Sequence, residues 1–600
     1  MIERMKKIIL LVAESDRDRI LKKLRILGVL HVKHINNPEH HEIRFVGDRI
    51  AKLEKMMAIL EQYSRKIDLA EANKKISEKE MLERFDLVEE AYNKKNELRL
   101  KVGEIKKDLL WYNEWGECCP EDIKELRKKG ISLKLYRVKK EDLKKLKDET
   151  YFILSQKKGY VNLVTMAHME EEKELFLEET RFPDIGPEQM KTTIKELLMQ
   201  IEGIDKFFLE QAAYYKSIKT CEENLKNEYY FMNVKFGMQE EKEFSYIQGF
   251  CPDKKVEKIK KLSEKYKTGY LISEPEDSDE APTLISNPAW IKIIDPVFQF
   301  MNTLPGYDEF DISPIFLVFF SVFFAMLVGD AGYGLIFLSL TYLLMKKFKK
   351  APKQPFILLF VLSISTIIWG TITGTWFGAE RISQMPILRS LVIPGIYSFS
   401  EASQNTVIYI CFVIGAVHLT IAHLIKGIRY INSLFVASQL GWILIVWGMF
   451  FTAGTFVLGK PFPGAGKFLL IAGIMMVLFF SNCQKGIVKG ALTTLVDLPL
   501  SVIGAFSDVV SYLRLFAVGY ASVVVAQSFN GMALEGGINS ILGGLAAACI
   551  LFFGHLLNII LAFMAVIVHG VRLNMLEFSG HLGMQWSGKK YEPFCENGGK

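Results

Sequence analysis

The second half of the chain consists of apolar segments long enough to cross a lipid bilayer. One span needs about 20 apolar residues. Seven apolar blocks with few charges run at 312–345, 354–378, 406–426, 433–458, 467–482, 488–533 and 540–575. Within lipid, a single segment can satisfy its own backbone hydrogen bonds only as a helix. These blocks therefore predict an all-α membrane domain, which we place at residues 311–600.

The first 310 residues have a different composition, dense in Lys and Glu. The net charge of +6 averages two unlike halves, so it indicates membrane topology rather than binding of nucleic acid. The apolar run near the start, KKIILLVAE, is short and lacks a cleavage site, which favours a buried strand over a signal peptide. We expect this half to be cytoplasmic. The eight cysteines are scattered, and the Cys118–Cys119 pair predicts neither a zinc site nor a disulfide framework.

Three segments of the cytoplasmic half alternate short strands with amphipathic helices, at 6–35, 131–167 and 244–275. This pattern predicts small α+β lobes of the ferredoxin-like kind. We expect one lobe to combine residues 1–40 with 240–280, and a distal lobe to occupy 120–180.

Two stretches between these lobes carry apolar residues at heptad-like spacing. The positions are Ile43, Val46, Ile50, Leu53, Met57, Leu60 and Ile67, then Ile194, Leu197, Ile201, Ile204, Phe208 and Ile218. Heptad spacing with a charged remainder predicts a long antiparallel coiled-coil arm, at 41–115 and 185–235. The alternative is a set of ordinary amphipathic helices in a compact domain.

Charge determines how the apolar blocks are counted. The first block is interrupted at Gly329–Gly334 and is followed by the lysine-rich segment 346–353. A hairpin at Gly329-Asp330 returns those lysines to the cytoplasm, as positive loops prefer. The loops at 423–431 and 482–490 are then cytoplasmic, and those around 380–405, 459–466 and 534–539 lie outside. We predict about eight spans with both termini cytoplasmic.

The last two blocks are longer than one span requires. The 46 residues of 488–533 make about 69 Å of helix against a hydrocarbon core of about 30 Å. Either Pro499 breaks the first of these helices, or both are strongly tilted.

These two helices carry Arg514 and Arg572. A charge at the centre of a span costs about 2.5–3.5 kcal/mol, and a guanidinium cannot release its proton. Arg514 can therefore act only as a fixed positive charge. The nearest carboxylate on its own helix is Asp508, six residues earlier and in poor geometry, so we expect its counter-charge to come from elsewhere.

A polar stripe is predicted on the final helix, with His555, Asn558, Ala562, His569 and Arg572 on one face. With the predicted topology, Gln527, Asn530, His555 and Asn558 lie toward the outside. Asp508, Glu577 and His581 lie toward the cytoplasm. Two polar regions with arginines between them suggest two half-pathways that do not join. For Asn558, Gln527, His418 and His423 the alternative is hydrogen bonding that holds the helices together.

Nucleotide-binding motifs are not supported. The segment 459–468 lacks the spacing of a phosphate loop and has Phe468 where Ser or Thr must follow the lysine, and the glycines at 329–334 lie inside an apolar block. We expect no cofactor, no bound metal and no catalysis by the chain alone.

Four segments resemble subunit I (subunit a) of the V/A-type rotary ATPases of bacteria and archaea, and the resemblance covers the whole length. They are APTLISNPAWIKIIDPVFQFMNTLPGYDEFDISP (281–314), FFAMLVGDAGYG (323–334), SDVVSYLRLFAVGYA (507–521), and HGVRLNMLEFSGHLG with YEPF (569–583, 591–594).

The resemblance implies a stator subunit in the plasma membrane, beside a rotating proteolipid ring whose carboxylates carry H⁺ or Na⁺. It implies further partners: peripheral-stalk subunits, a central-stalk cap and, indirectly, the ATPase head. Arg514 matches the family's essential arginine, Arg572 its second one, and Glu577 its LEF-type position. Asp508 stands where some relatives carry histidine, and Ala562 replaces an outer acidic residue.

Two other functions remain open on the residues alone. A self-contained secondary transporter or channel with a cytoplasmic regulatory arm predicts internal repeats and paired broken helices, which the sequence does not suggest. A purely structural membrane anchor would have no use for an unpaired central arginine.

Overall fold

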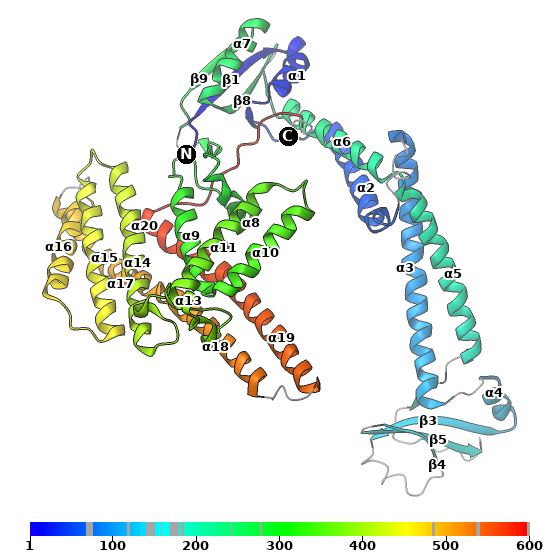
Figure 1. Cartoon of the computed structure of the whole chain (residues 1–600). Helices are drawn as coiled ribbons and strands as arrows, with labels where there is room; N and C mark the ends of the chain where they lie inside the picture. Colours follow the sequence, from blue (N-terminus) through cyan, green and yellow to red (C-terminus); the bar gives the residue numbers. More distant parts are fainter. Residues whose placement is uncertain are drawn as a thin grey trace. The chain divides into compact units, whose positions relative to one another are not determined.

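The computed structural model describes residues 1–67, 76–116, 120–139, 151–157, 159–168, 179–180, 182, 185–241, 243–276, 279–482, 487–535 and 541–596. Cys118, Cys119 and Cys483 lie outside these residues. The chain divides into two compact units. One holds residues 1–8, 250–261 and 271–593, and the other holds 9–249, 262–270 and 594–600. Figure 1 shows the helices and strands of the whole chain.

The first lobe is built on a five-stranded sheet. Its strands are β1 (Met5–Ala13), β2 (His31–Lys33), β7 (Gln239–Glu241), β8 (Phe244–Pro252) and β9 (Gly269–Ser273), in the order β2-β8-β1-β9 with β7 on β8. Helix α1 (Arg17–Leu27) joins β1 to β2, and α7 (Val256–Tyr266) joins β8 to β9. Two strand–helix–strand units sharing one sheet in this order form a ferredoxin-like lobe, as the sequence predicts.

The distal lobe has a second sheet, ordered β4-β5-β3-β6, with α4 (Pro120–Lys128) before it. Its strands are β3 (Ile131–Lys139), β4 (Tyr151–Lys157), β5 (Tyr160–His168) and β6 (Glu179–Thr180). Strands β3 and β5 pair antiparallel over their whole length, from Ile131 opposite His168 to Lys139 opposite Tyr160. The helix expected between β3 and β4 falls on residues 140–150, outside the described residues.

Four long helices connect these lobes in sequence. They are α2 (His41–Ser64), α3 (Glu78–Trp115), α5 (Pro187–Ala212) and α6 (Tyr215–Phe236). The heptad residues Val46, Ile50, Leu53, Phe208 and Ile218 are buried together in one core. A second core joins α3 to α5 through Leu98, Val102 and Ile201. The apolar spacing therefore marks the packed faces, and the supercoiled arm itself stays a prediction.

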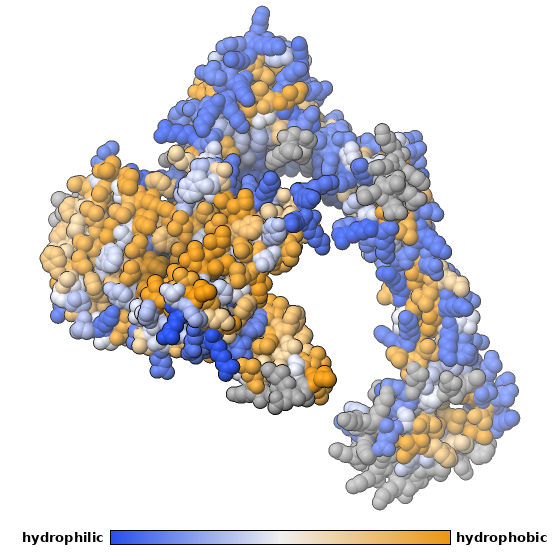
Figure 2. Space-filling model, in the orientation of Figure 1, coloured by the Kyte–Doolittle hydropathy of each residue, from blue (hydrophilic) through white to orange (hydrophobic). Residues whose placement is uncertain are grey.

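The C-terminal half is helical. Its helices are α9 (Ser313–Val328), α10 (Ala331–Lys347), α11 (Lys353–Thr373), α14 (Glu401–Arg429), α15 (Phe435–Leu458), α16 (Gly464–Phe480), α17 (Ile487–Ser511), α18 (Leu513–Glu535) and α19 (Ile541–Ala565), with α20 (Ser579–Leu582) at the end. Figure 2 shows apolar side chains over much of their visible surface, whereas the lobes and long helices before them are mainly hydrophilic there.

Within the described residues, five helices are long and apolar enough to cross a membrane, and six are if α9 and α10 are taken together. Helix α16 is shorter, with 17 residues. Helices α9 and α10 meet at an angle of 119°, so the chain breaks at Gly329-Asp330 as predicted. The total of eight spans stays a prediction.

Asp330 holds this break in place. Its Oδ1 accepts hydrogen bonds from the backbone N–H of Gly332 (2.7 Å) and Phe377 (2.9 Å), and its Oδ2 accepts from Gly378 (2.9 Å). A fourth, longer bond comes from Tyr333. Gly329 has φ +68°, a conformation that glycine adopts without strain. The buried carboxylate therefore joins the start of α10 to the loop after α11.

The two long C-terminal helices are interrupted, but not at Pro499. Residues 489–534 and 541–582 form helical stretches of 46 and 42 residues. Pro499 lies inside α17, and the interruption falls at Tyr512, between α17 and α18. The last helix contains two π-helical segments, Val566–Gly570 and Leu573–Phe578.

The predicted polar stripe is correct only for the first part of the last helix. Asn558 and Ala562 are buried, whereas Arg572 is exposed. The prediction assumed 3.6 residues per turn throughout, and a π-helical turn contains more residues than an α-helical one. The positions after Val566 are therefore rotated away from the face that His555 and Asn558 share.

Candidate ion pathway between the C-terminal helices

Polar side chains join α17 and α18 to the last helix at four levels. The pairs are Asn530 with His555, Ser522 with Asn558, Arg514 with Glu577, and Asp508 with His581. We call this set the polar ladder. It begins near the α18–α19 connection and ends near the C-terminal end of the last helix, so it runs along the length of both helices.

The level nearest the α18–α19 connection is a hydrogen-bonded network, which we call the outer network. His555 Nε2 lies 3.1 Å from Asn530 Oδ1, and its Nδ1 lies 2.8 Å from the Tyr333 hydroxyl. Asn558 donates from Nδ2 to the same hydroxyl (2.9 Å) and to the backbone oxygen of Ser522 (2.9 Å). Tyr333 therefore connects α10, next to the Asp330 break, to the last helix.

Arg514 is paired within the chain, by a carboxylate that another helix supplies. Its Nη2 donates to Oε1 of Glu577, and its Nε donates to the backbone oxygen of Ser511 (3.0 Å). Arg572 Nε lies 3.5 Å from the same oxygen of Glu577. The prediction considered only the helix that carries Arg514, whereas the partner comes from the helix that packs against it.

The three charges differ in exposure. Glu577 is 4% exposed, Arg514 24% and Arg572 52%. Glu577 Oε2 is buried and has no hydrogen-bond partner among the described residues. The single carboxylate of Glu577 thus faces the two guanidinium groups of Arg514 and Arg572, so these three side chains together carry a net positive charge. The Oε2 atom of Glu577 remains available as a hydrogen-bond acceptor.

The level at the other end forms a longer chain, which we call the inner network. Asp508 Oδ2 lies 3.0 Å from His581 Nε2, and His581 Nδ1 lies 2.9 Å from His423 Nε2. His423 Nδ1 lies 2.9 Å from Oε1 of Gln439. A cavity of about 350 Å³ adjoins these four residues. Its remaining lining is Lys426, Phe435, Trp442, Ser481, Ser501, Gly504, Ala505 and Gly580.

Two predicted pathway residues are not part of these networks. Gln527 is exposed on α18. His569 is half-buried in the first π-helical segment, and its buried Nδ1 has no hydrogen-bond partner among the described residues.

Four residues of the two networks are not among the predicted pathway residues: Tyr333, Ser522, His423 and Gln439. His423 was read as a bundle-holding residue, and Tyr333 as part of a glycine-rich break. A polar side chain inside an apolar block was the available signal for all four. Which of them share a network depends on contacts between helices far apart in sequence.

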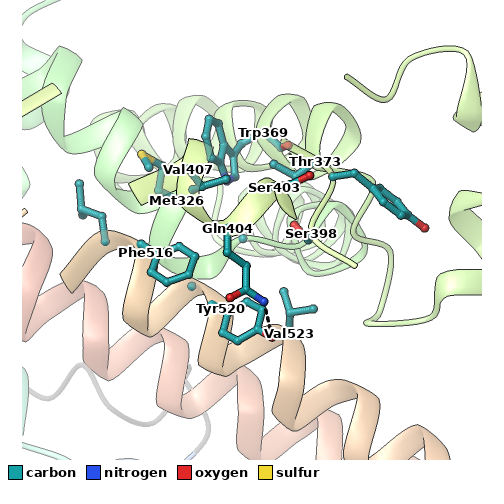
Figure 3. A pocket seen from close by; sticks show the side chains of 14 residues that line it. Met326, Trp369, Thr373, Ser398, Ser403, Gln404, Val407, Phe516, Tyr520 and Val523 are labelled. Carbon is teal, nitrogen blue, oxygen red and sulfur yellow. Dashed lines mark hydrogen bonds between the residues drawn. The ribbon is translucent and has the colours of Figure 1, made fainter. Parts of the chain in front are cut away.

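A second, smaller cavity of about 40 Å³ lies against α18, where Phe516, Tyr520 and Val523 line it. Figure 3 shows the side chains around this cavity. Gln404 of α14 donates a hydrogen bond to the hydroxyl of Tyr520 on α18, at 3.0 Å. Thr373, Ser398 and Ser403 add polar groups to its wall. The volume has room for a few water molecules.

One group of metal-ligand side chains occurs among the described residues. His40, His41 and Glu42, at the start of α2, place one possible ligand atom each within 4.8 Å of one another. The side chains of His41 and Glu42 are exposed. The group lies in the unit that does not contain the ladder.

Comparison with known proteins decides the family. The chain is 32% identical to V-type ATP synthase subunit I of Borreliella burgdorferi over 624 aligned residues, which cover 99% of each chain. It belongs to the V-type ATP synthase subunit I family. A second subunit I, from Treponema pallidum, is 28% identical over 99% of this chain and 100% of its own. The A-type subunit I of Methanocaldococcus jannaschii is 28% identical over 59% of this chain and 55% of its own.

Two further comparisons add nothing to the subunit I assignment. No family model matches the chain. A crystal structure described as the cytoplasmic N-terminal domain of subunit I, homolog of subunit a, of V-ATPase covers 44% of this chain at 14% identity, with a TM-score of 0.24. Membership of the subunit I family, together with the apolar helices, makes the chain a multi-pass membrane subunit of a rotary ATPase complex involved in ion transport.

Proposed function

We propose that this chain is the stator subunit that couples translocation of H⁺ or Na⁺ to rotation of a proteolipid ring. The observation that carries the proposal is the position of Arg514. It lies between two separate polar networks on the longest apolar helices of a subunit I. The two networks serve as the outer and inner half-pathways.

The physical requirement comes from the ring. A ring carboxylate that faces lipid must be neutral, because an isolated charge in hydrocarbon is prohibitively costly. When rotation brings it to Arg514, the fixed positive charge favours the ionised carboxylate, and the bound ion leaves through one half-pathway. The next ion enters from the other half-pathway. Because a guanidinium cannot lose its proton, the same charge blocks direct leakage between the two.

Glu577 gives this cycle a resting state. Between ring carboxylates, Arg514 is held by Glu577 rather than left as an isolated buried charge. An arriving ring carboxylate then competes with Glu577 for the same guanidinium. Arg572, whose Nε lies 3.5 Å from the same oxygen of Glu577, gives that carboxylate a second cationic contact while Arg514 turns to the ring. Exchange between two carboxylates costs far less than exposing a bare charge.

The rest of the chain connects this site to the complex. The two lobes and four long helices of the first 310 residues suit contacts with peripheral-stalk subunits, the central-stalk cap and, through them, the ATPase head. With the predicted topology, both termini are cytoplasmic and the subunit resides in the plasma membrane.

The test is ATP-driven ion transport by the assembled complex in vesicles. Arg514→Ala should abolish coupled transport while the complex still assembles. Arg514→Lys should fail largely as well, since an ammonium lacks the planar fork that pairs with a carboxylate. Arg381→Ala is the matched control and should transport normally, because Arg381 is exposed in the short helix α12 (Glu380–Ser383). Transport at the wild-type rate by Arg514→Ala would refute the proposal.

The rival function, a self-contained transporter or channel, predicts activity from the purified chain alone. Full-length similarity to two curated ATP synthase subunits favours the rotary complex. Co-purification with ATPase subunits and a proteolipid ring would support the stator, and ion transport by the isolated chain would support the rival.

A further inference from the structure

The inner network is a continuous series of hydrogen-bonded side chains, which an ion pathway does not need in general. Three titratable side chains from three different helices form one unbroken series: His423 on α14, His581 on α20 and Asp508 on α17. Successive polar atoms lie 2.9 and 3.0 Å apart. Gln439, on α15, ends the series at 2.9 Å from His423. Each imidazole therefore contacts one neighbour through each of its two nitrogens.

The hydrogen bonds in this series can run in two directions. In the first, the Gln439 amide donates to His423, His423 donates to His581, and His581 donates to an ionised Asp508. In the second, Asp508 carries a proton and donates to His581, His581 donates to His423, and His423 donates to the Gln439 oxygen. An amide can present either its oxygen or its NH₂ group, so Gln439 satisfies both.

The two arrangements differ by one proton. When a proton binds His423 Nδ1, the proton on His423 Nε2 moves to His581 Nδ1. The proton on His581 Nε2 then moves to Asp508. Each N–H bond breaks as the next bond forms, and no other group changes charge. Asp508 ends neutral with one added proton, and the 180° rotation of the Gln439 amide accompanies the transfer.

The surroundings of the series do not suit a sodium ion. Hard cations such as Na⁺ bind several oxygen ligands at once, and contacts of 2.9–3.0 Å leave no gap in which an ion could sit between the side chains. The adjoining cavity presents the Lys426 ammonium, two imidazoles and the Trp442 ring beside the oxygens of Asp508, Gln439, Ser481 and Ser501. When Lys426 carries its proton, the ammonium repels a second cation at this range.

The series also lies where an ion would approach Arg514. Asp508 is its most exposed member and precedes Arg514 by six residues, and His581 follows Glu577 by four. His423 is buried and borders the cavity. Chains of Asp and His inside membrane proteins mark proton relays. Whatever ion the ring site prefers, it must pass this region to reach or leave Arg514.

We propose that His423, His581 and Asp508 form a proton relay in the inner half-pathway, and that the ion this subunit passes is therefore H⁺ rather than Na⁺. The proposal rests on the stator function above and names its substrate.

The ion is tested first, with the assembled complex in proteoliposomes. Acidification on addition of ATP is followed with a pH-sensitive dye at sodium concentrations from micromolar to millimolar, and ²²Na⁺ uptake is measured in parallel. The expected result is acidification that does not depend on sodium, with no ²²Na⁺ accumulation. ATP-driven ²²Na⁺ accumulation that Arg514→Ala abolishes would overturn the relay while leaving the stator function intact.

The relay residues are tested next. His423→Gln, His581→Gln and Asp508→Asn keep hydrogen-bonding groups but cannot bind and release a proton, so each should slow ATP-driven acidification about tenfold or more. Asp508→Glu should restore most of the rate, which separates proton transfer from a structural role. Ser501→Ala is the control, because Ser501 lines the same cavity but donates only to its own helix backbone.

Assembly of each variant is checked by co-purification of the other subunits. If His423→Gln fails to assemble, the comparison of Asp508→Asn with Asp508→Glu carries the test. Wild-type acidification by assembled Asp508→Asn, or equal loss in Asp508→Glu, would overturn the proposal.

Discussion

Replacing Glu577 with glutamine is expected to destabilise the membrane domain more than any single change at Arg572. The substitution removes the one negative charge between two guanidinium groups. Arg514, which is 24% exposed, would then have only neutral acceptors, the amide oxygen of the new glutamine and the backbone oxygen of Ser511. Arg572 is 52% exposed and can be solvated without Glu577.

The magnitude follows from charge separation and exposure. Two unit charges about 4 Å apart interact by about 4 kcal/mol at an effective dielectric constant of 20. Removing one member of a fully buried pair costs about 3–5 kcal/mol. Because Arg514 retains partial exposure, we expect a loss of about 2–4 kcal/mol in the free energy of unfolding for Glu577→Gln. For Arg572→Gln, whose contact is longer and half-exposed, we expect less than about 1 kcal/mol.

Reversible unfolding in mixed micelles of SDS and a non-ionic detergent measures these free energies. The double variant Arg514→Gln, Glu577→Gln should lose less unfolding free energy than the two single variants lose together, and the difference should be at least about 1 kcal/mol. Each single variant leaves one charge of the pair without its partner, whereas the double variant removes both charges. Losses that add, or a loss for Arg572→Gln as large as that for Glu577→Gln, would refute the assignment of Arg514 and Glu577 as the dominant pair.

Three further outcomes are expected. Asp330→Ala leaves three buried backbone N–H groups and one partly buried one without their acceptor, and each buried group left unpaired costs about 1–3 kcal/mol. The variant should lose assembled complex on size exclusion, whereas the exposed-loop change Ser390→Ala should not. Tyr512→Phe removes the 2.9 Å contact of its hydroxyl with His418 Nδ1 and should lower the unfolding free energy by about 1–2 kcal/mol; an unchanged value in the same micelle assay would contradict this. In the N-terminal half, burial opposes ionisation of Asp205, but hydrogen bonds from Lys95 and Tyr63 outweigh it and hold the Asp205 pKa below its usual value. A lowered carboxyl pKa adds stability above the unfolded pKa of about 4, and this is lost as pH falls through the folded value. Asp205→Asn should therefore lower the thermal midpoint at pH 7 and much less at pH 3; an equal decrease at both would contradict the pairing.

Much of the fold followed from sequence patterns because those patterns reflect local physics. A run of apolar residues long enough for a bilayer indicates a helix wherever it occurs, and all seven predicted blocks contain helices. Alternation of strands and amphipathic helices predicted the first lobe, whose strand order agrees. Gly329 and Asp330 predicted the break between α9 and α10, because glycine ends helices and aspartate begins them.

The prediction was weaker where the backbone departs from regular geometry. Proline was the natural candidate for a break in the 46-residue helix, yet α17 accommodates Pro499 and the helix is interrupted at Tyr512. The polar stripe was predicted with 3.6 residues per turn, a periodicity that does not hold in the π-helical segments Val566–Gly570 and Leu573–Phe578. Both features depend on packing against other helices, which a single-helix pattern does not contain.

The amino-acid sequence is enough to show that one charge, Arg514, stands inside a long apolar segment, and that polar residues lie before and after it on two predicted helices. A charge in an apolar segment is costly in any fold, so it can be recognised without a structure. The partner of Arg514 depends on helix packing. Glu577 is 63 residues away in the chain and reaches Arg514 because the two C-terminal helices pack together. The same packing brought His423, from a third helix, to His581, since which side chains meet is a property of helix contacts and not of spacing along one chain.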